Sequence, residues 1–125
     1  MQNNPVGWFE IYVQDMNRAK AFYEAVFERK LSELNMGDDS MRMLTFPGEM
    51  DRYGAMGALV QMADCPSGGG GTLIYFSCTD CAIEAARAAQ HGGQIFRDKF
   101  AIGEYGHIAL IVDTEGNMLG LHSMQ

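Results

Sequence analysis

The chain has 125 residues, with nine basic side chains against sixteen acidic ones and a formal net charge of -7. Its length suits one domain with a core of ordinary size, and its negative charge argues against nucleic acid or an anionic membrane as a partner. No apolar run approaches the ~20 residues that a membrane helix requires. With three cysteines and no secretion-type N-terminus, we expect a soluble cytoplasmic protein without a disulfide framework.

The first half of the chain begins with a strand that passes directly into a helix. Val6 to Gln14 alternates apolar and polar side chains as a half-buried strand does, and Asp15 follows at the position of a helix N-cap. The helix beyond it has an apolar stripe at i, i+3, i+4 and i+7, formed by Ala19, Phe22, Tyr23 and Val26. Three short strands are predicted to follow, over Arg29 to Met36, Met41 to Phe46 and Ala55 to Met62.

The same order of elements recurs 65 positions later. A strand is predicted over Thr72 to Thr79, then Asp80 as a cap and a helix over Cys81 to His91 that ends at a glycine pair. The three strands of this second half are predicted over Gln94 to Ile102, His107 to Val112 and Met118 to Ser123.

The repeat predicts an α+β fold built from two tandem βαβββ modules. These are residues 1–66 and 72–125, joined by a Gly-rich linker at 67–71 within a single domain, 1–125. One amphipathic helix per module covers one face of its sheet, so we expect the mixed sheet to curve and leave its other face around a cleft. Strand alternation assigns the cleft-facing side chains as Trp8, Glu10, Tyr12, Leu73, Tyr75 and Ser77.

Three stretches carry a resemblance to a known family. They are the opening strand and helix from Trp8 to Tyr23, the loop Ile102 to Gly106, and the hairpin Asp113 to Asn117. Over nearly its whole length the chain resembles the vicinal oxygen chelate superfamily, the group of glyoxalases, bleomycin-resistance proteins and extradiol dioxygenases.

The resemblance also implies where a divalent metal would be held. In catalytic members, His or Gln on the first strand of each module and Glu on the last strand ligate it. Counted back from the helix caps and aligned through the repeat, these positions hold Trp8, Gly57, Leu73 and Gly120. None of them can ligate a metal through its side chain. We therefore expect no metal, no other cofactor, and neither a glyoxalase I nor a dioxygenase mechanism.

Two residues are candidates for proton transfer. Glu10 lies beside Trp8 on the same predicted face, where desolvation favours the neutral carboxyl group that a general acid requires. The alternative is a partly wetted Glu10 that pairs with a donor from a neighbouring strand. His122 faces the cleft with Gly120, and His107 can do the same. A displaced metal site formed by Glu10, His107 and His122 is a minor alternative.

Further residues are candidates for ligand binding. Trp8, Tyr12 and Tyr75 would line an aromatic cleft, with room left by Gly120, and Glu104 and Tyr105 lie in a Gly-flanked loop that could close over a ligand. A Met-lined cleft is a less favoured use of the ten methionines.

A cysteine pair offers a different chemistry. Cys78 and Cys81 form a C-x-x-C at a strand-to-helix junction, where a helix N-terminus can activate a thiol. We favour a role in the core and cap, because Cys78 is predicted to face the helix.

Three functions follow from these features. The first is a glyoxalase-related lyase or isomerase that acts on a small oxygenated substrate without the usual metal. The second is a bleomycin-resistance-like protein that sequesters a small molecule without catalysis, and the third is a redox protein. Because an open sheet leaves edges to cover, we also expect the modules to pair within one chain or between two, with a homodimer as the expected assembly.

Overall fold

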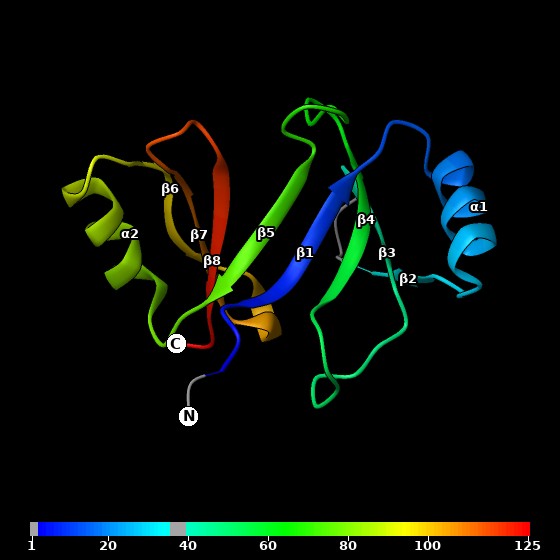
Figure 1. Ribbon diagram of the computed structural model, residues 1–125, viewed down its shortest axis with the longest axis horizontal. Coiled ribbons are helices and arrows are strands. Elements are labelled where there is room, and N and C mark those ends of the chain that lie inside the picture. The colour runs from blue at the N-terminus through cyan, green and yellow to red at the C-terminus, as the bar shows by residue number, and fades with distance from the viewer. Residues whose placement is uncertain (1–2, 36–39) are drawn as a thin grey trace. The chain divides into compact units, whose positions relative to one another are not determined.

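The computed structural model describes residues 3–35 and 40–125 (Figure 1). The chain divides into two compact units. The N-terminal unit is Trp8–Thr72, and the C-terminal unit combines the residues up to Gly7 with Leu73–Gln125. The described helices include none long and apolar enough to cross a membrane.

The N-terminal unit follows the predicted order of a strand, a helix and three strands. Its elements are β1 (Val6–Tyr12), α1 (Met16–Phe27), β2 (Ser32–Leu34), β3 (Met41–Thr45) and β4 (Met56–Met62). Its strands lie in the order β2-β3-β4-β1, with β1 parallel to β4 and the other neighbours antiparallel. β2 is shorter than predicted, and the Met36 end of that prediction lies outside the described residues.

Local hydrogen bonds explain where α1 begins and ends. The Asp15 carboxylate accepts from the Arg18 amide at 3.1 Å, which confirms Asp15 as the N-cap. The side-chain oxygen of Gln61 on β4 accepts from the Met16 amide at 2.9 Å, so the first turn is also tied to the sheet. The helix ends at Glu28, whose φ of 53° lies in the left-handed region.

The core of the N-terminal unit lies between α1 and one face of its sheet. Val13, Met16, Leu31, Leu44 and Leu59 are buried there, as strand alternation predicts for β1. The predicted stripe of α1 is partly wrong, however. Ala19 and Tyr23 pack against this core, whereas Phe22 is 58% exposed and Val26 is 53% exposed. The face of α1 that contains Met16, Ala19 and Tyr23 packs on the sheet. Phe22 and Val26 lie on another side of the helix, so their side chains point away from the sheet.

The C-terminal unit repeats this arrangement. Its elements are β5 (Thr72–Ser77), α2 (Cys81–Gln90), β6 (Gln94–Ala101), the 3₁₀ turn η1 (Gly103–Tyr105), β7 (His107–Val112) and β8 (Met118–Ser123). Its strands lie in the order β5-β8-β7-β6, with β5 parallel to β8. β7 and β8 have the predicted bounds.

The start of α2 is fixed by both a cap and the sheet. Asp80 accepts from the Ala82 amide at 3.0 Å and from the Lys99 ammonium at 2.9 Å, which confirms the predicted cap. The amide of Cys81 donates to the hydroxyl of Ser123 on β8 at 3.0 Å. The core under α2 contains Cys81, Ala85, Ala109, Ile111 and Leu121.

Two glycines on the last strands lie directly beneath aromatic rings. A Cβ added to Gly57 would lie 2.5 Å from three ring atoms of Phe9, its parallel partner on β1. A Cβ added to Gly120 would overlap the ring of Tyr75, its partner on β5. Each ring therefore occupies the space that a side chain on the neighbouring strand would need.

Gly57→Ala tests this close contact. We expect a loss of about 1–3 kcal/mol in the free energy of unfolding, because the added methyl group displaces the Phe9 ring from its contact with Phe46. Urea denaturation measures the loss. Gly69→Ala is the matched control, since nothing lies within 4 Å of its added Cβ. Equal stability of the two variants would contradict the account.

The hairpin before β8 depends on one carboxylate. Asp113 accepts from the Asn117 amide at 2.9 Å, from the Asn117 side chain at 3.1 Å and from the Glu115 amide at 2.8 Å. Donation by Asn117, and then by Glu115, holds the pKa of Asp113 below its ordinary value of 3.8. Gly116 completes the turn at a φ of 86°.

The hairpin carboxylate predicts an acid-dependent stability. Because the pKa of Asp113 is lower in the folded chain, its stabilising contribution is present above pH 3.8 and is lost as the pH falls through the folded-state value. Asp113→Asn should therefore melt below the wild type at neutral pH, and the gap should close near pH ~2. Thermal melts across this range, with Asp51→Asn as an exposed control, would refute the idea if the gap were independent of pH.

Candidate functional site

A carboxylate on β1 joins two aromatic side chains of the same strand. The indole Nε1–H of Trp8 donates to Glu10 Oε2 at 3.1 Å, and the hydroxyl of Tyr12 donates to Glu10 Oε1 at 2.7 Å. Glu10 is only 8% exposed, and it is one of two polar residues among the buried ones described. We call Trp8, Glu10 and Tyr12 the Glu10 cluster. Sequence alternation predicted their common face, and the alternative in which a donor from a neighbouring strand pairs with Glu10 stays a prediction.

The Glu10 cluster lies on the open face of the N-terminal sheet, the side opposite α1. On β4, Ala58 is the register partner of Glu10, and Val60 is the partner of Tyr12. Both are fully buried, and with Met43 they form a second apolar cluster against which Trp8 and Tyr12 pack. The register adds four methionines to this face, namely Met41, Met43, Met56 and Met62.

In the C-terminal unit, Tyr75, Gly120 and His122 lie on the sheet face opposite α2. Tyr75 is buried and covers Gly120, while His122 is the register partner of Ser77. The His122 Nε2 lies 2.6 Å from the backbone oxygen of Tyr105. This contact joins the last strand to η1.

Glu104 and Tyr105 are exposed in η1, and their closure over a ligand stays a prediction. The turn is flanked by glycines with positive φ, Gly103 at 70° and Gly106 at 99°. Its contact with His122 shows that η1 is attached to the sheet at one backbone group.

His107 lies on the other side of its sheet, so its predicted placement with His122 is wrong. It pairs with Ser123, which faces α2, whereas His122 pairs with the next residue of β7, Ile108. Because neighbouring residues of a strand point to opposite faces, His107 and His122 cannot share a ligand. The displaced site of Glu10, His107 and His122 is therefore not formed. Within the described ranges no group of three His, Cys, Asp or Glu side chains could hold a metal ion.

One of the four family metal positions is corrected by the register. Gly57 pairs with Phe9 and faces α1, so it is not the counterpart of Gly120. Tyr75 pairs with Gly120 and the equivalent Glu10 pairs with Ala58, which makes Ala58 the counterpart. The four positions thus hold Trp8, Ala58, Leu73 and Gly120, none of which has a donor atom suited to a divalent cation. The residues present do not fit the family's metal.

The cysteine pair has the properties of core residues. Burial, and then the nearby Glu84 carboxylate, raises the pKa of Cys78 to about 11. Cys81 is fully buried under α2. A thiol that stays protonated at neutral pH is a weak nucleophile, so this arrangement does not favour the redox hypothesis.

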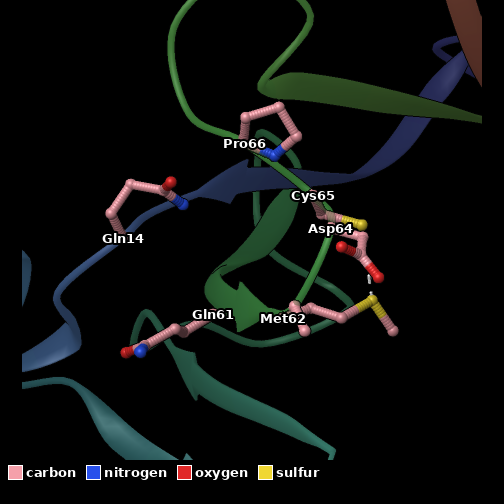
Figure 2. A pocket seen from close by; sticks show the side chains of 7 residues that line it. Gln14, Gln61, Met62, Asp64, Cys65 and Pro66 are labelled. Carbon is pink, nitrogen blue, oxygen red and sulfur yellow. Dashed lines mark hydrogen bonds between the residues drawn. The ribbon is translucent and has the colours of Figure 1, made fainter.

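Two open hollows lie at the end of the N-terminal sheet rather than over Trp8 and Glu10. The larger, of about 570 Å³, lies among the ends of β1 and β4 and the turn beyond β4. Figure 2 shows Gln14 and Gln61 on one side of it and Met62, Asp64 and Cys65 on the other. The Cys65 thiol lies 3.5 Å from the Met62 sulfur. The smaller hollow, of about 300 Å³, includes Tyr12 of the Glu10 cluster in its lining.

None of the four methionines on the open face is among the predicted site residues, although the composition offered a Met-lined cleft as a less favoured alternative. Met41 and Met43 on β3, and Met56 and Met62 on β4, are separated by even numbers of positions. Each pair therefore lies on one face of its strand, and this spacing is visible in the sequence. The sequence spacing alone does not show that both pairs share a face with the Glu10 cluster. The pairing of β3 with β4 and of β4 with β1 shows it. The register thus gathers four methionines on this face, and the Met-lined cleft, the less favoured alternative from composition, stays a prediction.

Solved structures show the same fold. A methylmalonyl-CoA epimerase from Mycobacterium tuberculosis is 16% identical, with 97% of this chain and 88% of that chain covered and a TM-score of 0.69. A hypothetical protein from Bacillus halodurans C-125 is 12% identical, with 99% and 96% covered and a TM-score of 0.73. A Streptomyces coelicolor methylmalonyl-CoA epimerase variant in complex with 2-nitronate-propionyl-CoA is 16% identical, with 94% and 92% covered and a TM-score of 0.69.

Sequence comparison identifies the family. A search of curated proteins found no match. The model of the Glyoxalase/Bleomycin resistance protein/Dioxygenase superfamily matches residues 6–121, which is nearly the whole chain. The two βαβββ units and this match agree with the resemblance seen in the opening strand and the last hairpin. The chain belongs to the glyoxalase/bleomycin resistance protein/dioxygenase superfamily.

Proposed function

We propose that the protein binds a small organic ligand on the open face of its N-terminal unit, without the divalent metal of its catalytic relatives. The Glu10 cluster is the observation that supports this. It combines a buried carboxylate with an indole and a phenol on a face rich in methionine. Such a face offers apolar and polarisable contacts around one fixed polar group, the usual composition of a small-molecule site.

Glu10 is the group that we propose to contact the polar part of the ligand. In the catalytic form of the proposal it takes a proton from a small oxygenated substrate or returns one, as a general acid or base. The new bond is between the proton and the carboxylate oxygen, and the electron pair of the broken bond stays on the substrate. Trp8 and Tyr12 position the carboxylate for this transfer through their two hydrogen bonds.

Sequestration without catalysis is the second candidate. Both oxygens of Glu10 already accept hydrogen bonds from Trp8 and Tyr12, so a ligand must share or replace one of them. A carboxylate held in this way suits recognition of a donor or cation as well as proton transfer. The two candidates share the binding face and differ in whether the ligand is changed.

The single tryptophan provides a direct assay of this face. We would titrate a panel of small carbonyl compounds and acyl-CoA thioesters, the latter because similar solved structures are methylmalonyl-CoA epimerases, and follow Trp8 fluorescence. A binding compound should change the emission of Trp8. Glu10→Gln should raise the dissociation constant about tenfold or more, since hydrogen bonds to a charged group contribute ~1.5–3 kcal/mol.

Product analysis by NMR then separates the two candidates. Turnover that disappears in Glu10→Gln supports proton transfer, whereas binding without turnover in the wild type supports sequestration. Glu49→Gln, at an exposed carboxylate of the same unit, is the matched control and should behave as the wild type. If Glu10→Gln binds and converts the compound as well as the wild type, Glu10 has no role in the site.

A further inference from the structure

We propose that the outer face of α1 is a self-association surface, on which the α1 helix of a second copy of this chain packs antiparallel. The surface, here called the outer stripe, follows the spacing i, i+3, i+4, i+7 and i+8. Its residues are Arg18, Ala21, Phe22, Ala25 and Val26, all of them exposed. This proposal is independent of the ligand site, since the Glu10 cluster lies on the opposite face of the N-terminal sheet from α1.

The outer stripe exposes large apolar side chains that a second helix could cover. Phe22 is 58% exposed and Val26 is 53% exposed, one helical turn apart, with two exposed alanines beside them. Isolated apolar residues at a surface are normal, but a contiguous apolar stripe on a helix is typical of an interface. Its i, i+3, i+4, i+7 spacing is the pattern by which one helix packs on another.

The shape of the stripe is complementary to itself. Phe22 and Val26 protrude, whereas Ala21 and Ala25 leave low points between them. When a two-fold axis crosses the outer stripe midway between Ala21 and Ala25, Ala21 of one copy lies opposite Ala25 of the other. This pairing of small residues lets the backbones approach closely, so that each Phe22 can insert beside the facing helix.

The charges of α1 favour the same antiparallel register. The first turn has no acidic residue but carries Arg18, and the last turn has no basic residue and is followed by Glu28. Each charge is thus at the end of the helix dipole that disfavours it. In the register that pairs Ala21 with Ala25, Arg18 of one copy lies opposite Glu28 of the other. The second copy therefore supplies the charge complement that the single helix lacks.

The size of the stripe sets the expected strength. One helix face covers less than the ~800 Å² per partner of a standard interface, so we expect a dimer that dissociates on dilution in the micromolar range. The sequence alone suggested a homodimer from uncovered sheet edges, and the outer stripe places the contact on α1 instead.

Sedimentation over about 1–200 µM protein tests the proposal. The wild type should pass from monomer to dimer, and Phe22→Ser should raise the dissociation constant about tenfold or more. Phe96→Ser, at a 65% exposed aromatic residue of β6, is the matched control and should dimerise as the wild type. A wild type that stays monomeric, or a Phe22→Ser protein that dimerises normally, would overturn the proposal.

A charge reversal tests the register separately. Arg18→Glu and Glu28→Arg should each weaken the dimer, and the double variant should restore it, because the pair is only exchanged between copies. Both positions are exposed, so melting temperatures near that of the wild type are expected and exclude unfolding as the cause. A double variant no stronger than the single ones would overturn the antiparallel arrangement.

Discussion

The buried carboxylate of Glu10 is the constraint on which the open face of the N-terminal unit depends. A carboxylate removed from water is costly unless donors satisfy it, and here the indole of Trp8 and the hydroxyl of Tyr12 do so from positions two residues away on the same strand. These bonds fix the orientation of both aromatic rings. On the neighbouring strand β4, the register partners of Glu10 and Tyr12 are Ala58 and Val60. Both are fully buried, and their small side chains leave space for the cluster. The polar centre of the face and its apolar surroundings are therefore one arrangement.

Strand faces and helix caps could be predicted because they depend on local rules. A period of two placed Glu10 with Trp8 and Tyr12, and Asp15 and Asp80 stood where helix caps are needed. Features that depend on the pairing register of the strands could not be predicted from the sequence. His107 begins β7, but only its pairing with Ser123 shows that it faces α2. The counterpart of Gly120 is Ala58 rather than Gly57, because the pairing of β1 with β4 sets this position and spacing along the chain does not. The apolar spacing of α1 predicts Phe22 in the core, but the helix carries apolar residues on more than one side, and periodicity does not say which side meets the sheet.

The family assignment and the chemistry of the site diverge in this chain. The superfamily match and the two βαβββ units establish the fold, yet the positions of the family's metal ligands hold Trp8, Ala58, Leu73 and Gly120. A fold supplies places for functional groups, and the function depends on which groups occupy them. Here the first strand carries a carboxylate two residues beyond the usual ligand position, and Tyr75 occupies the equivalent position of the second unit. The group on this strand that could act on a ligand is therefore the carboxylate of Glu10 and not a metal ion.

The indole N–H resonance of the only tryptophan tests this account most directly. In a ¹⁵N-labelled protein, we expect one resolved Trp8 indole signal that exchanges slowly with water, because the indole Nε1–H donates a hydrogen bond to Glu10 Oε2, with 3.1 Å between the two atoms. Glu10→Leu should shift this signal and speed its exchange, while Glu49→Leu should leave it unchanged. A Trp8 indole that exchanges with water as fast as free tryptophan, or that does not respond to the loss of Glu10, would contradict the central role of the Glu10 cluster.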